Sequence, residues 1–574
     1  MRIRPWLAKT HSKQSELVRH FFSQQLSSQL TSSDQAQRFL VAIFVVLAGV
    51  GPLVVRMYMP KYGYLQSLPT PGLYLAAVRA DRLFFVSLSM TVVGFITALH
   101  WENLFPGRLD YLTLKSLPVR LYQVFIARFL AAFTIAAVVV LDLNFSASVL
   151  FPLLTSGRWQ TPAFGFSYVF AHAVATMGAG LFIFFAITAV QGFCLNLFSP
   201  RAFARLSEPM QAFFVTTFVA VGPYVIDMPN WYAMIAARPN WMSFFPPAWF
   251  LGLYEKLQGT HELYFVRLSK ISVWAMAAGI VGAFAAYSVT YRRSAGRVLE
   301  ESLRIPNRES SRTIGALNAF CNLLIRDPHD RAVFDFSIRI LQRNRRHRLL
   351  VGYTVGAALV VALEAVAPII IAKFRSGEPW YSWQLESIAA APLIVGVVLI
   401  SAFRYVFQLP AELQANWIFR MANGPGLLNS VERLLVLCGV LPAVLVTLPV
   451  EVLPFGRFLT FAHATLSAAL LLLFIEMGLR EWRKIPFTCS YLPGRRNLWA
   501  TIGAYFIVFA VAIPAMAHFE VWLHQPFLLF GVASGLSILY LKLRSTRRNQ
   551  WKIVSVLFDE SEEPQVESLR LSPN

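Results

Sequence analysis

Long apolar runs separated by short polar segments are the feature that most constrains how this chain can fold. A helix needs about 20 mostly apolar residues to cross the hydrocarbon core of a bilayer, which is about 30 Å thick. Runs of this kind lie near 39–57, 83–100, 124–143, 165–192, 207–226, 269–291, 349–372, 387–407, 432–450, 457–479, 498–516 and 525–542. Only 14% of the residues are charged, whereas soluble domains contain about 25%. We therefore predict an all-α, polytopic integral membrane protein with about twelve transmembrane helices.

The positions of the Lys and Arg residues predict how the spans are oriented. Basic residues gather before the first run, after the second, fourth and tenth runs, and after the last run, whereas 153–164, 451–456 and 517–524 contain one or two at most. Because cytoplasmic loops are enriched in Lys and Arg, we expect a multi-pass protein of the inner (plasma) membrane with both termini in the cytoplasm. The net charge of +21 then reflects orientation, and we expect no nucleic acid as a partner.

A basic segment near the middle of the chain divides it into two halves. This linker, 292–348, separates a first six-span half at 39–291 from a second six-span half at 349–542. A cytoplasmic segment, 1–38, precedes the first half, and a cytoplasmic tail, 543–574, follows the second. The arginines of the linker either anchor it on the positive side of the membrane or contact anionic lipid or an acidic partner.

The two halves repeat the same order of features, which predicts pseudo-symmetry. A helical pattern of apolar residues precedes the first span of each half: Leu17, Val18, Phe21, Phe22, Leu26 and Leu30, and later Val333, Phe334, Phe336, Ile338, Ile340 and Leu341. Such amphipathic helices are expected to lie at the membrane interface, in contact with lipids. A Leu-Pro doublet follows the second span of each half.

Each Leu-Pro doublet lies in a polar segment that predicts a short helix between two spans. Proline suits the first turn of a helix, and Pro410 is followed by Ala411 and Glu412, an acid favoured in a first turn. The first doublet lies in the turn-rich segment Trp101–Leu130. A short rigid helix there can transmit a push, and the alternative is an ordinary cytoplasmic turn.

A second notable segment, 227–268, is expected outside the cell. It is aromatic and interrupted by prolines, and it includes Pro246, Pro247, Trp249 and Phe250. Trp and Tyr are favoured at the membrane–water interface, so one interpretation is an aromatic belt. The other interpretation is an external gate over a transport pathway.

Residues for chemistry are few. No GxxxxGK[ST] loop is present to hold nucleotide phosphates, and the four cysteines show no CxxC pair or metal-ligand spacing. We predict no catalytic residue, no metal and no cofactor bound by this chain. The candidates for chemistry among the ionisable residues of the apolar runs are Asp142, His172, Glu364, His463 and Glu476. Of these, Glu364 and His463 lie deepest, and they either contribute to a cargo or proton path or serve helix packing.

Three patches of sequence resemble one known family. The segment FPGRLDYLTLKSLPVRLYQVFIARFL at 105–130 is similar to the cytoplasmic loop of ABC-2-type exporter permeases, in which a short coupling helix docks on the ATPase subunit. FFPPAWFLGLYEKLQG at 244–259 resembles the stretch before the last span of a six-span half in large permeases of this kind. FQLPAELQANWIFRMA at 407–422 resembles the matching loop of the second half, which has no Pro-Pro-Trp-Phe stretch near 517–524.

The resemblance implies the transmembrane subunit of an ATP-driven exporter whose two halves are fused in one chain. The partner would be a separate ABC ATPase subunit, as a dimer, with ATP bound there. By position, the contact with the ATPase would be made by Leu117, Pro118, Val119, Arg120, Leu121, Leu409, Pro410, Ala411 and Glu412. A twelve-span secondary transporter driven by an ion gradient is the main alternative, and a membrane-embedded enzyme is a weaker one.

Overall fold

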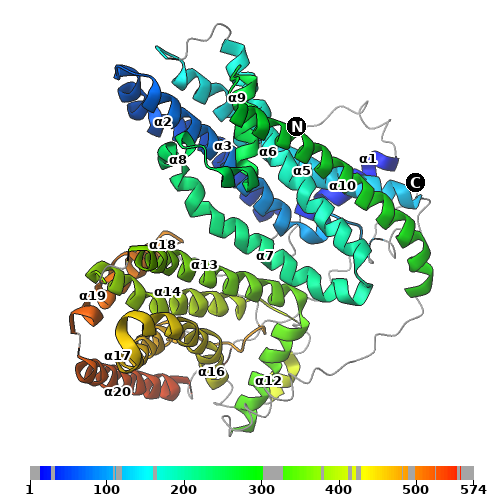
Figure 1. The fold of residues 1–574 in the computed structure, drawn as a ribbon. Coiled ribbons are helices and arrows are strands. Elements are labelled where there is room, and N and C mark those ends of the chain that lie inside the picture. Colours follow the sequence, from blue (N-terminus) through cyan, green and yellow to red (C-terminus); the bar gives the residue numbers. More distant parts are fainter. Residues whose placement is uncertain are drawn as a thin grey trace. The chain divides into compact units, whose positions relative to one another are not determined.

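The computed structural model describes most of the chain as helices packed side by side (Figure 1). It describes residues 13–26, 33–107, 110, 119–159, 165–301, 327–376, 380–411, 416–421, 428–480, 482–488, 498–523, 525–551 and 556. These residues contain no β-strand. The all-α prediction is therefore confirmed for this part of the chain.

Eleven helices in the described residues are long and apolar enough to cross a membrane. They are Phe44–Ser67, Gly72–Leu99, Leu121–Thr155, Phe166–Leu197, Ala202–Asn230, Leu263–Arg293, Arg345–Phe374, Ser382–Val406, Asn429–Leu479, Gly503–Leu523 and Pro526–Trp551. These eleven helices indicate a polytopic helical membrane protein. Its spans extend several of the predicted runs by a helical turn or more at one end.

The count differs from twelve at one place, because the predicted spans 432–450 and 457–479 fall in one helical stretch. Asn429–Leu479 has 51 residues, which as a straight helix would measure about 75 Å, well beyond the bilayer core. Gly456 interrupts it with a φ of 69°, a left-handed conformation that glycine adopts without steric cost. The expected loop at 451–456 is thus reduced to a break at one residue.

The chain divides into two compact units, Met1–Pro306 and Asn307–Asn574. In the first unit, α3 (Gly72–Leu99) lies against α6 (Gly165–Leu197), α7 (Pro200–Asp227) and the short α9 (Pro246–Leu257). The remaining spans of this unit pack around them: α2 (Ser33–Ser67) lies along α5 (Leu121–Thr155), and α10 (Leu263–Glu301) lies along α6 and α9. Most of α3 is buried, so it forms the core of the unit.

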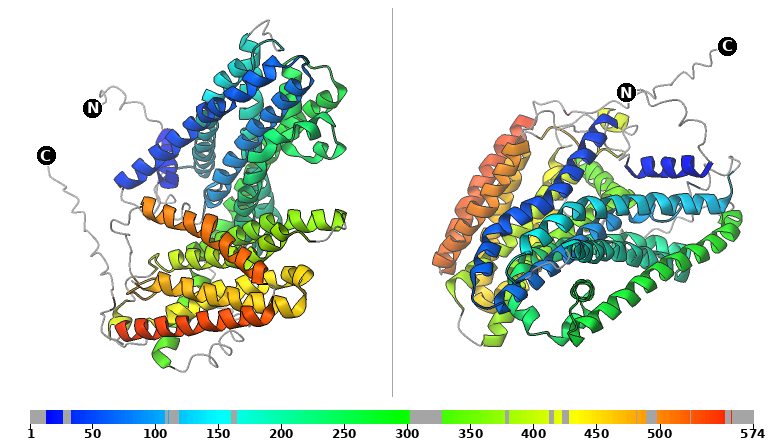
Figure 2. Two further views of the ribbon diagram at one scale, coloured as in Figure 1. Left: turned by 90° about the vertical axis from the view of Figure 1, so that its left-hand side faces the viewer. Right: turned by 90° about the horizontal axis from the view of Figure 1, so that it is seen from above.

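In the second unit, four spans lie side by side in the order α13 (Arg345–Ser376), α14 (Ser382–Val406), α17 (Leu441–Leu479) and α20 (Pro526–Trp551) (Figures 1 and 2). Shorter helices complete it: α12 (Pro328–Arg343), α15 (Asn416–Met421), α16 (Asn429–Leu435), α18 (Leu498–Ile507) and α19 (Ile513–Leu523). The predicted external loop at 517–524 is helical as far as Leu523, within α19.

Both predicted amphipathic helices form, and each covers part of its apolar face with protein. The N-terminal helix α1 (Lys13–Leu26) buries Leu17 and Phe21 against Val124 and Ala127 of α5. Helix α12 buries Val333 and Phe334 in contacts with neighbouring elements of the second unit. Burial of these side chains removes apolar area from water, and each contributes about 1.5–3 kcal/mol when fully covered.

Candidate functional site

The loop after α3 is buried at its start. It begins with the short helix η2 (Trp101–Asn103), and the Trp101 side chain is 0% exposed. The indole N–H of Trp101 donates to Ser207 Oγ on α7 at 2.9 Å, and Gln191 Nε2 on α6 donates to the Trp101 carbonyl at 2.7 Å. Because buried polar groups need such partners, these bonds fix the loop to two helices.

A third helix holds the next residues of the loop. The rings of Phe105 and Tyr287, the latter on α10, stack with their centroids 4.3 Å apart, and the Tyr287 hydroxyl donates to the Leu104 carbonyl. Leu104 and Phe105 are both buried. We call Trp101, Asn103, Leu104 and Phe105 the loop anchor.

Arg128 of α5 joins the loop anchor to the N-terminal helix. Its guanidinium donates to Asn103 Oδ1 at 2.9 Å and to Gln24 Oε1 of α1 at 2.8 Å. It also lies 4.9 Å from the centre of the Phe21 ring and 3.9 Å from the Asp110 carboxylate. A planar guanidinium with several fixed donors suits this role, and it makes α1, α5 and the loop one connected structure.

The predicted coupling residues of the first half follow the loop anchor in the sequence, at 117–121. Leu117 and Pro118 are outside the described residues. Val119 is half-buried beside α1, and Leu121 begins α5 and is also half-buried. Arg120 is exposed, and its backbone N–H donates to Gln123 Oε1 at 2.9 Å. Arg120 is therefore a solvent-facing charge at the first turn of a long span.

The matching loop of the second unit is held differently, through its backbone. The Phe487 N–H donates to the Phe407 carbonyl at 3.1 Å, and the Ala411 N–H donates to the Phe487 carbonyl at 3.0 Å. Leu409 is buried, and its carbonyl lies 3.4 Å from Nε2 of the buried His347. Pro410 is half-buried. Ala411 is half-buried as well, and Glu412 lies outside the described residues.

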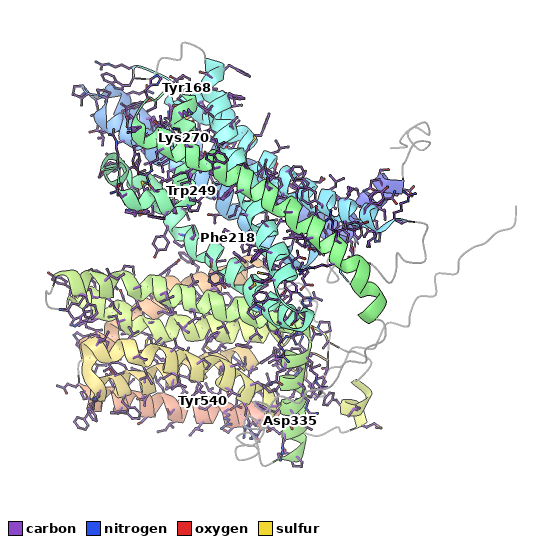
Figure 3. The ribbon with its side chains drawn as sticks, turned by 45° about the vertical axis from the view of Figure 1, so that its right-hand side comes forward. Tyr168, Phe218, Trp249, Lys270, Asp335 and Tyr540 are labelled. Carbon is purple, nitrogen blue, oxygen red and sulfur yellow. The ribbon has the colours of Figure 1, made fainter. Side chains whose placement is uncertain are left out.

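The candidate gate residues lie on α9 and face the interior of the first unit. Pro246 and Pro247 begin this helix, where proline is tolerated. Phe250 is buried, with its ring 5.5 Å from that of Phe182 on α6. Trp249 (Figure 3) is half-buried and donates its indole N–H to the Ser243 carbonyl at 2.8 Å. Phe250 and part of Trp249 are thus covered by protein, whereas the side chains of an aromatic belt would be exposed.

A charged network that sequence reasoning missed joins α9 to α3. Arg82 forms an ion pair with Glu255, and Arg79 Nε lies 3.0 Å from the other carboxylate oxygen of Glu255. Arg79 also pairs with Glu262 at 2.8 Å. Burial raises the pKa of Tyr254, under the Arg82 guanidinium, to about 12. The available signal was four charged residues, of which Arg79 and Arg82 lie about one helical turn apart just before an apolar run.

Another missed carboxylate in the first unit is neutralised in the same way. Asp81 is fully buried, and Lys61 Nζ lies 2.7 Å from its Oδ1 atom. The Tyr62 hydroxyl donates to its other oxygen at 2.6 Å. Asp81 therefore has both a cation and a neutral donor.

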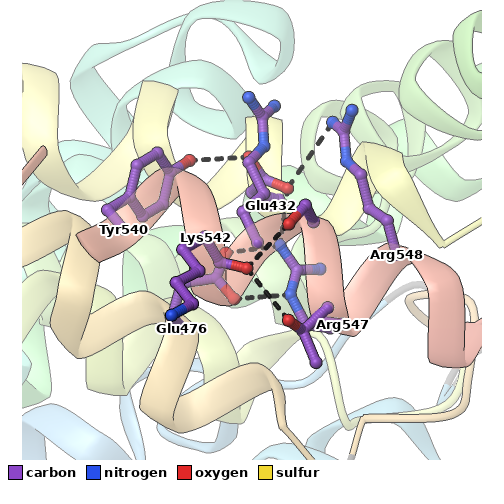
Figure 4. A network of polar contacts seen from close by, with 9 residues as sticks. Glu432, Glu476, Tyr540, Lys542, Arg547 and Arg548 are labelled. Atoms are coloured by element: carbon purple, nitrogen blue, oxygen red, sulfur yellow. Dashed lines mark hydrogen bonds and ion pairs between the residues drawn. The ribbon is translucent and has the colours of Figure 1, made fainter. Parts of the chain in front are cut away.

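The second unit contains a network centred on Arg547 of α20 (Figure 4). Its guanidinium lies 2.6 Å from both Glu476 on α17 and Glu432 on α16. Tyr540 donates to Glu432 at 2.8 Å, and Arg544 pairs with the same carboxylate at 2.6 Å. Sequence reasoning placed Glu476 near the end of its span and identified no partner for it.

The structure gives the two deepest predicted polar residues different surroundings. His463 is buried, and its Nδ1 atom lies 2.9 Å from Oε2 of Glu520 on α19. Glu364 is half-buried on α13, and its Oε1 atom has no hydrogen-bond partner among the described residues. No hydrogen bond or ion pair joins Glu364 to His463 in that part of the chain. Glu520 was missed because its segment was assigned to a loop.

Comparisons with models of known families, with curated proteins and with solved structures found no match. Within the described ranges, no three His, Cys, Asp or Glu side chains are arranged to hold a metal ion. The packing and charge distribution of the chain itself are therefore the basis for a functional proposal.

Proposed function

We propose that this chain is the transmembrane permease subunit of an ATP-driven exporter of the ABC-2 type, which couples to a separate ATPase subunit. The observation that carries this proposal is the loop anchor. Its residues Trp101, Leu104 and Phe105 are buried. Trp101 bonds the loop anchor to α6 and α7, and Leu104 and Phe105 contact α10. A force applied to the exposed Arg120 region would reach several spans through these contacts.

The anchored loop suits coupling better than an ordinary turn does. A turn needs only to reverse the chain and is usually exposed. Here Arg128 also connects the loop to α1, so a displacement of the loop would reach that helix as well. Tightly packed elements have discrete arrangements and transmit displacements. The second loop, bonded through Phe407 and Phe487, would receive the other ATPase subunit.

In this proposal the chain crosses the inner membrane twelve times, six times in each half, with both termini in the cytoplasm. The stretch Asn429–Leu479 then counts as two spans that meet at Gly456. The half-buried and buried residues of α9, including Trp249 and Phe250, would lie at the external end and close a pathway.

Co-purification tests the proposal. The full chain is purified from its native membrane, and an ABC ATPase subunit is expected to accompany it. Arg120→Glu combined with Glu412→Arg should weaken this association by about tenfold or more, through charge repulsion and lost contacts. Arg158→Glu is the matched control, because it reverses a charge just beyond the other end of α5.

Two results would contradict the proposal at different points. If the ATPase binds the Arg120 and Glu412 double variant as tightly as it binds the wild type, the coupling residues are wrong. If no ATPase accompanies the wild-type chain, the exporter assignment is wrong.

A secondary transporter is the second candidate, and the buried His463–Glu520 pair favours it. Carriers place ionisable groups within the membrane to bind the coupling ion. Reconstituted into vesicles without any ATPase, a secondary transporter would carry protons or another cation down a gradient. The exporter permease would not.

A further inference from the structure

A groove opens between α6 and α10 of the first unit, near the C-terminal ends of both spans. The two helices pack side by side. The groove has a volume of about 620 Å³, which is within the range of about 300–1,000 Å³ for pockets that bind small molecules. Its walls are apolar: α6 contributes Val190, Phe193 and Leu197, and α10 contributes Ala285 and Val289. We call it the α6–α10 groove.

Small residues bring the two helices close together and leave space on their outer side. Gly192 lies so near α10 that a Cβ atom added there would be 2.5 Å from Cβ of Ala286. A Cβ atom added at Gly282 would be 3.2 Å from Cβ of Ala189. Small residues allow this close approach of membrane helices. Ala285 is exposed and has only a methyl group, so it does not fill the groove that it lines.

One end of the groove is polar. Of the described residues that line it, only Arg293 is charged. The Arg293 guanidinium donates to the carbonyl of Asn196, and Asn196 Nδ2 donates to Thr290 Oγ1 at 2.8 Å. These bonds hold the guanidinium beside the last turn of α6. Because a guanidinium has five N–H donors, one bond to a carbonyl leaves others for a second acceptor.

The walls and the charged end together indicate what fills the groove. Phe193 and Leu197 are 64% and 63% exposed, and such side chains on a membrane span face lipid. A water molecule needs several polar partners, which the apolar walls do not offer. An acyl chain can fill an irregular apolar groove, and a phosphate group pairs well with a guanidinium. Basic pockets between membrane helices bind anionic lipid head groups in this way.

We propose that the α6–α10 groove binds one anionic phospholipid, with an acyl chain along the apolar walls and the phosphate at Arg293. A zwitterionic phospholipid fits less well, because its own cationic group offsets the phosphate charge that Arg293 would attract. A second copy of the chain also fits less well, because a symmetric contact would bring a second Arg293 to the same patch. This inference is independent of the ATPase partner and holds for either candidate function.

Native mass spectrometry of the full chain tests the charged end of the site. The chain is purified in detergent with an equimolar mixture of phosphatidylglycerol and phosphatidylcholine, and the bound lipid is identified by its mass. The wild type should retain phosphatidylglycerol in preference to phosphatidylcholine. Arg293→Gln should reduce the retained phosphatidylglycerol by about fivefold, the effect expected of one basic residue. Arg292→Gln is the matched control, since Arg292 is also exposed but does not line the groove, and it should behave like the wild type.

A second pair of variants tests the apolar walls. Ala285→Leu places a larger side chain in the groove and should lose the bound phosphatidylglycerol. Ala278→Leu is the matched control, because Ala278 is an exposed alanine about two turns earlier on α10 that does not line the groove. Both changes are at exposed positions, so both variants should fold, and circular dichroism checks this. The proposal is overturned if Ala285→Leu retains the lipid, or if Arg292→Gln and Arg293→Gln lose it equally.

Photolabelling separates the lipid from other occupants of the groove. Phosphatidylglycerol with a diazirine in its acyl chain is added to nanodiscs that contain the full chain, and the labelled peptides are mapped. Labels should concentrate at 189–197 and 282–293 and decrease in Ala285→Leu. Labels spread evenly over the spans would overturn the proposal. A dimer of the chain that Ala285→Leu dissociates would assign the groove to a second copy and would overturn it as well.

Discussion

Two sites of buried carboxylates, one in each unit, have different partners. In the first unit, Glu255 faces Arg79 and Arg82, and Asp81 faces Lys61. At the contact of α17 and α19 in the second unit, Glu520 pairs with His463, and no Lys or Arg pairs with it among the described residues. A guanidinium stays charged at every accessible pH, whereas an imidazole titrates near neutrality. The carboxylates of the first unit are thus paired with arginines and a lysine, and Glu520 is paired with a histidine.

Arg82→Met should produce the largest effect, because it leaves Glu255 buried with one partner fewer. Removing one member of a buried ion pair lowers the free energy of unfolding by about 3–5 kcal/mol. The loss should be the same from mildly acidic to mildly alkaline pH. Unfolding in nanodiscs at a series of pH values measures it.

Arg238→Ala is the control for Arg82→Met. Arg238 pairs with Glu262 at 2.6 Å, but its side chain is 48% exposed, so its removal should cost about 1 kcal/mol or less. If Arg82→Met and Arg238→Ala lower the free energy of unfolding equally, the burial of Arg82 does not explain the size of its effect.

His463→Leu should have a smaller effect that depends on pH. It removes the partner of Glu520, which costs about 1–3 kcal/mol for a buried group left unsatisfied. In acidic buffer Glu520 can take up a proton instead, so the loss should shrink there and grow in alkaline buffer. If the loss of stability in His463→Leu does not depend on pH, the His463–Glu520 pair behaves like the arginine pairs of Glu255. The proposed difference between the two sites would then be wrong.

Asp330, outside the spans, is intermediate between these two sites, because it has an arginine partner and its pKa is nevertheless raised. It is buried in the first turn of α12 and lies 2.9 Å from Arg433, yet burial outweighs that arginine and raises the pKa of Asp330 to about 6. The folded state therefore binds the proton more tightly than the unfolded state. This contribution to stability is complete below a pH of about 4 and is lost as the pH rises through about 6.

Asp330→Asn should remove that pH dependence. Relative to the variant, the wild type should lose about 1–2 kcal/mol between pH 4 and pH 6, a discounted value because Arg433 reaches solvent. Chemical denaturation of both proteins across this window gives the difference. A wild type that gains stability relative to Asp330→Asn as the pH rises would show that Arg433 dominates over burial.

Trp101→Phe should have the smallest effect and no pH dependence. It removes a neutral hydrogen bond to Ser207, which contributes about 0.5–1.5 kcal/mol. Ser207→Ala should cost about the same, and the double variant should cost less than the sum, because both changes remove one bond. Strict additivity would mean that this bond does not anchor the loop.

The apolar runs predicted the spans because membrane helices need uninterrupted apolar length, and this held for residues such as those of α3 and α5. The burial of Trp101 could not be predicted, since its partner Ser207 lies 106 positions away. Glu451 and Glu520 were assigned to loops because a charge normally ends a span. Only the folded arrangement shows that both lie within helices and that Glu520 faces His463.

The contact between α1 and Arg128 also has a consequence for synthesis of the chain. Gln24 and Arg128 are 104 positions apart, so α1 leaves the ribosome long before its protein partner on α5 exists. Until α5 is inserted, Leu17 and Phe21 cannot bury themselves against Val124 and Ala127. An amphipathic helix of this kind can bind to the surface of a bilayer, which would cover the two side chains until α5 replaces it.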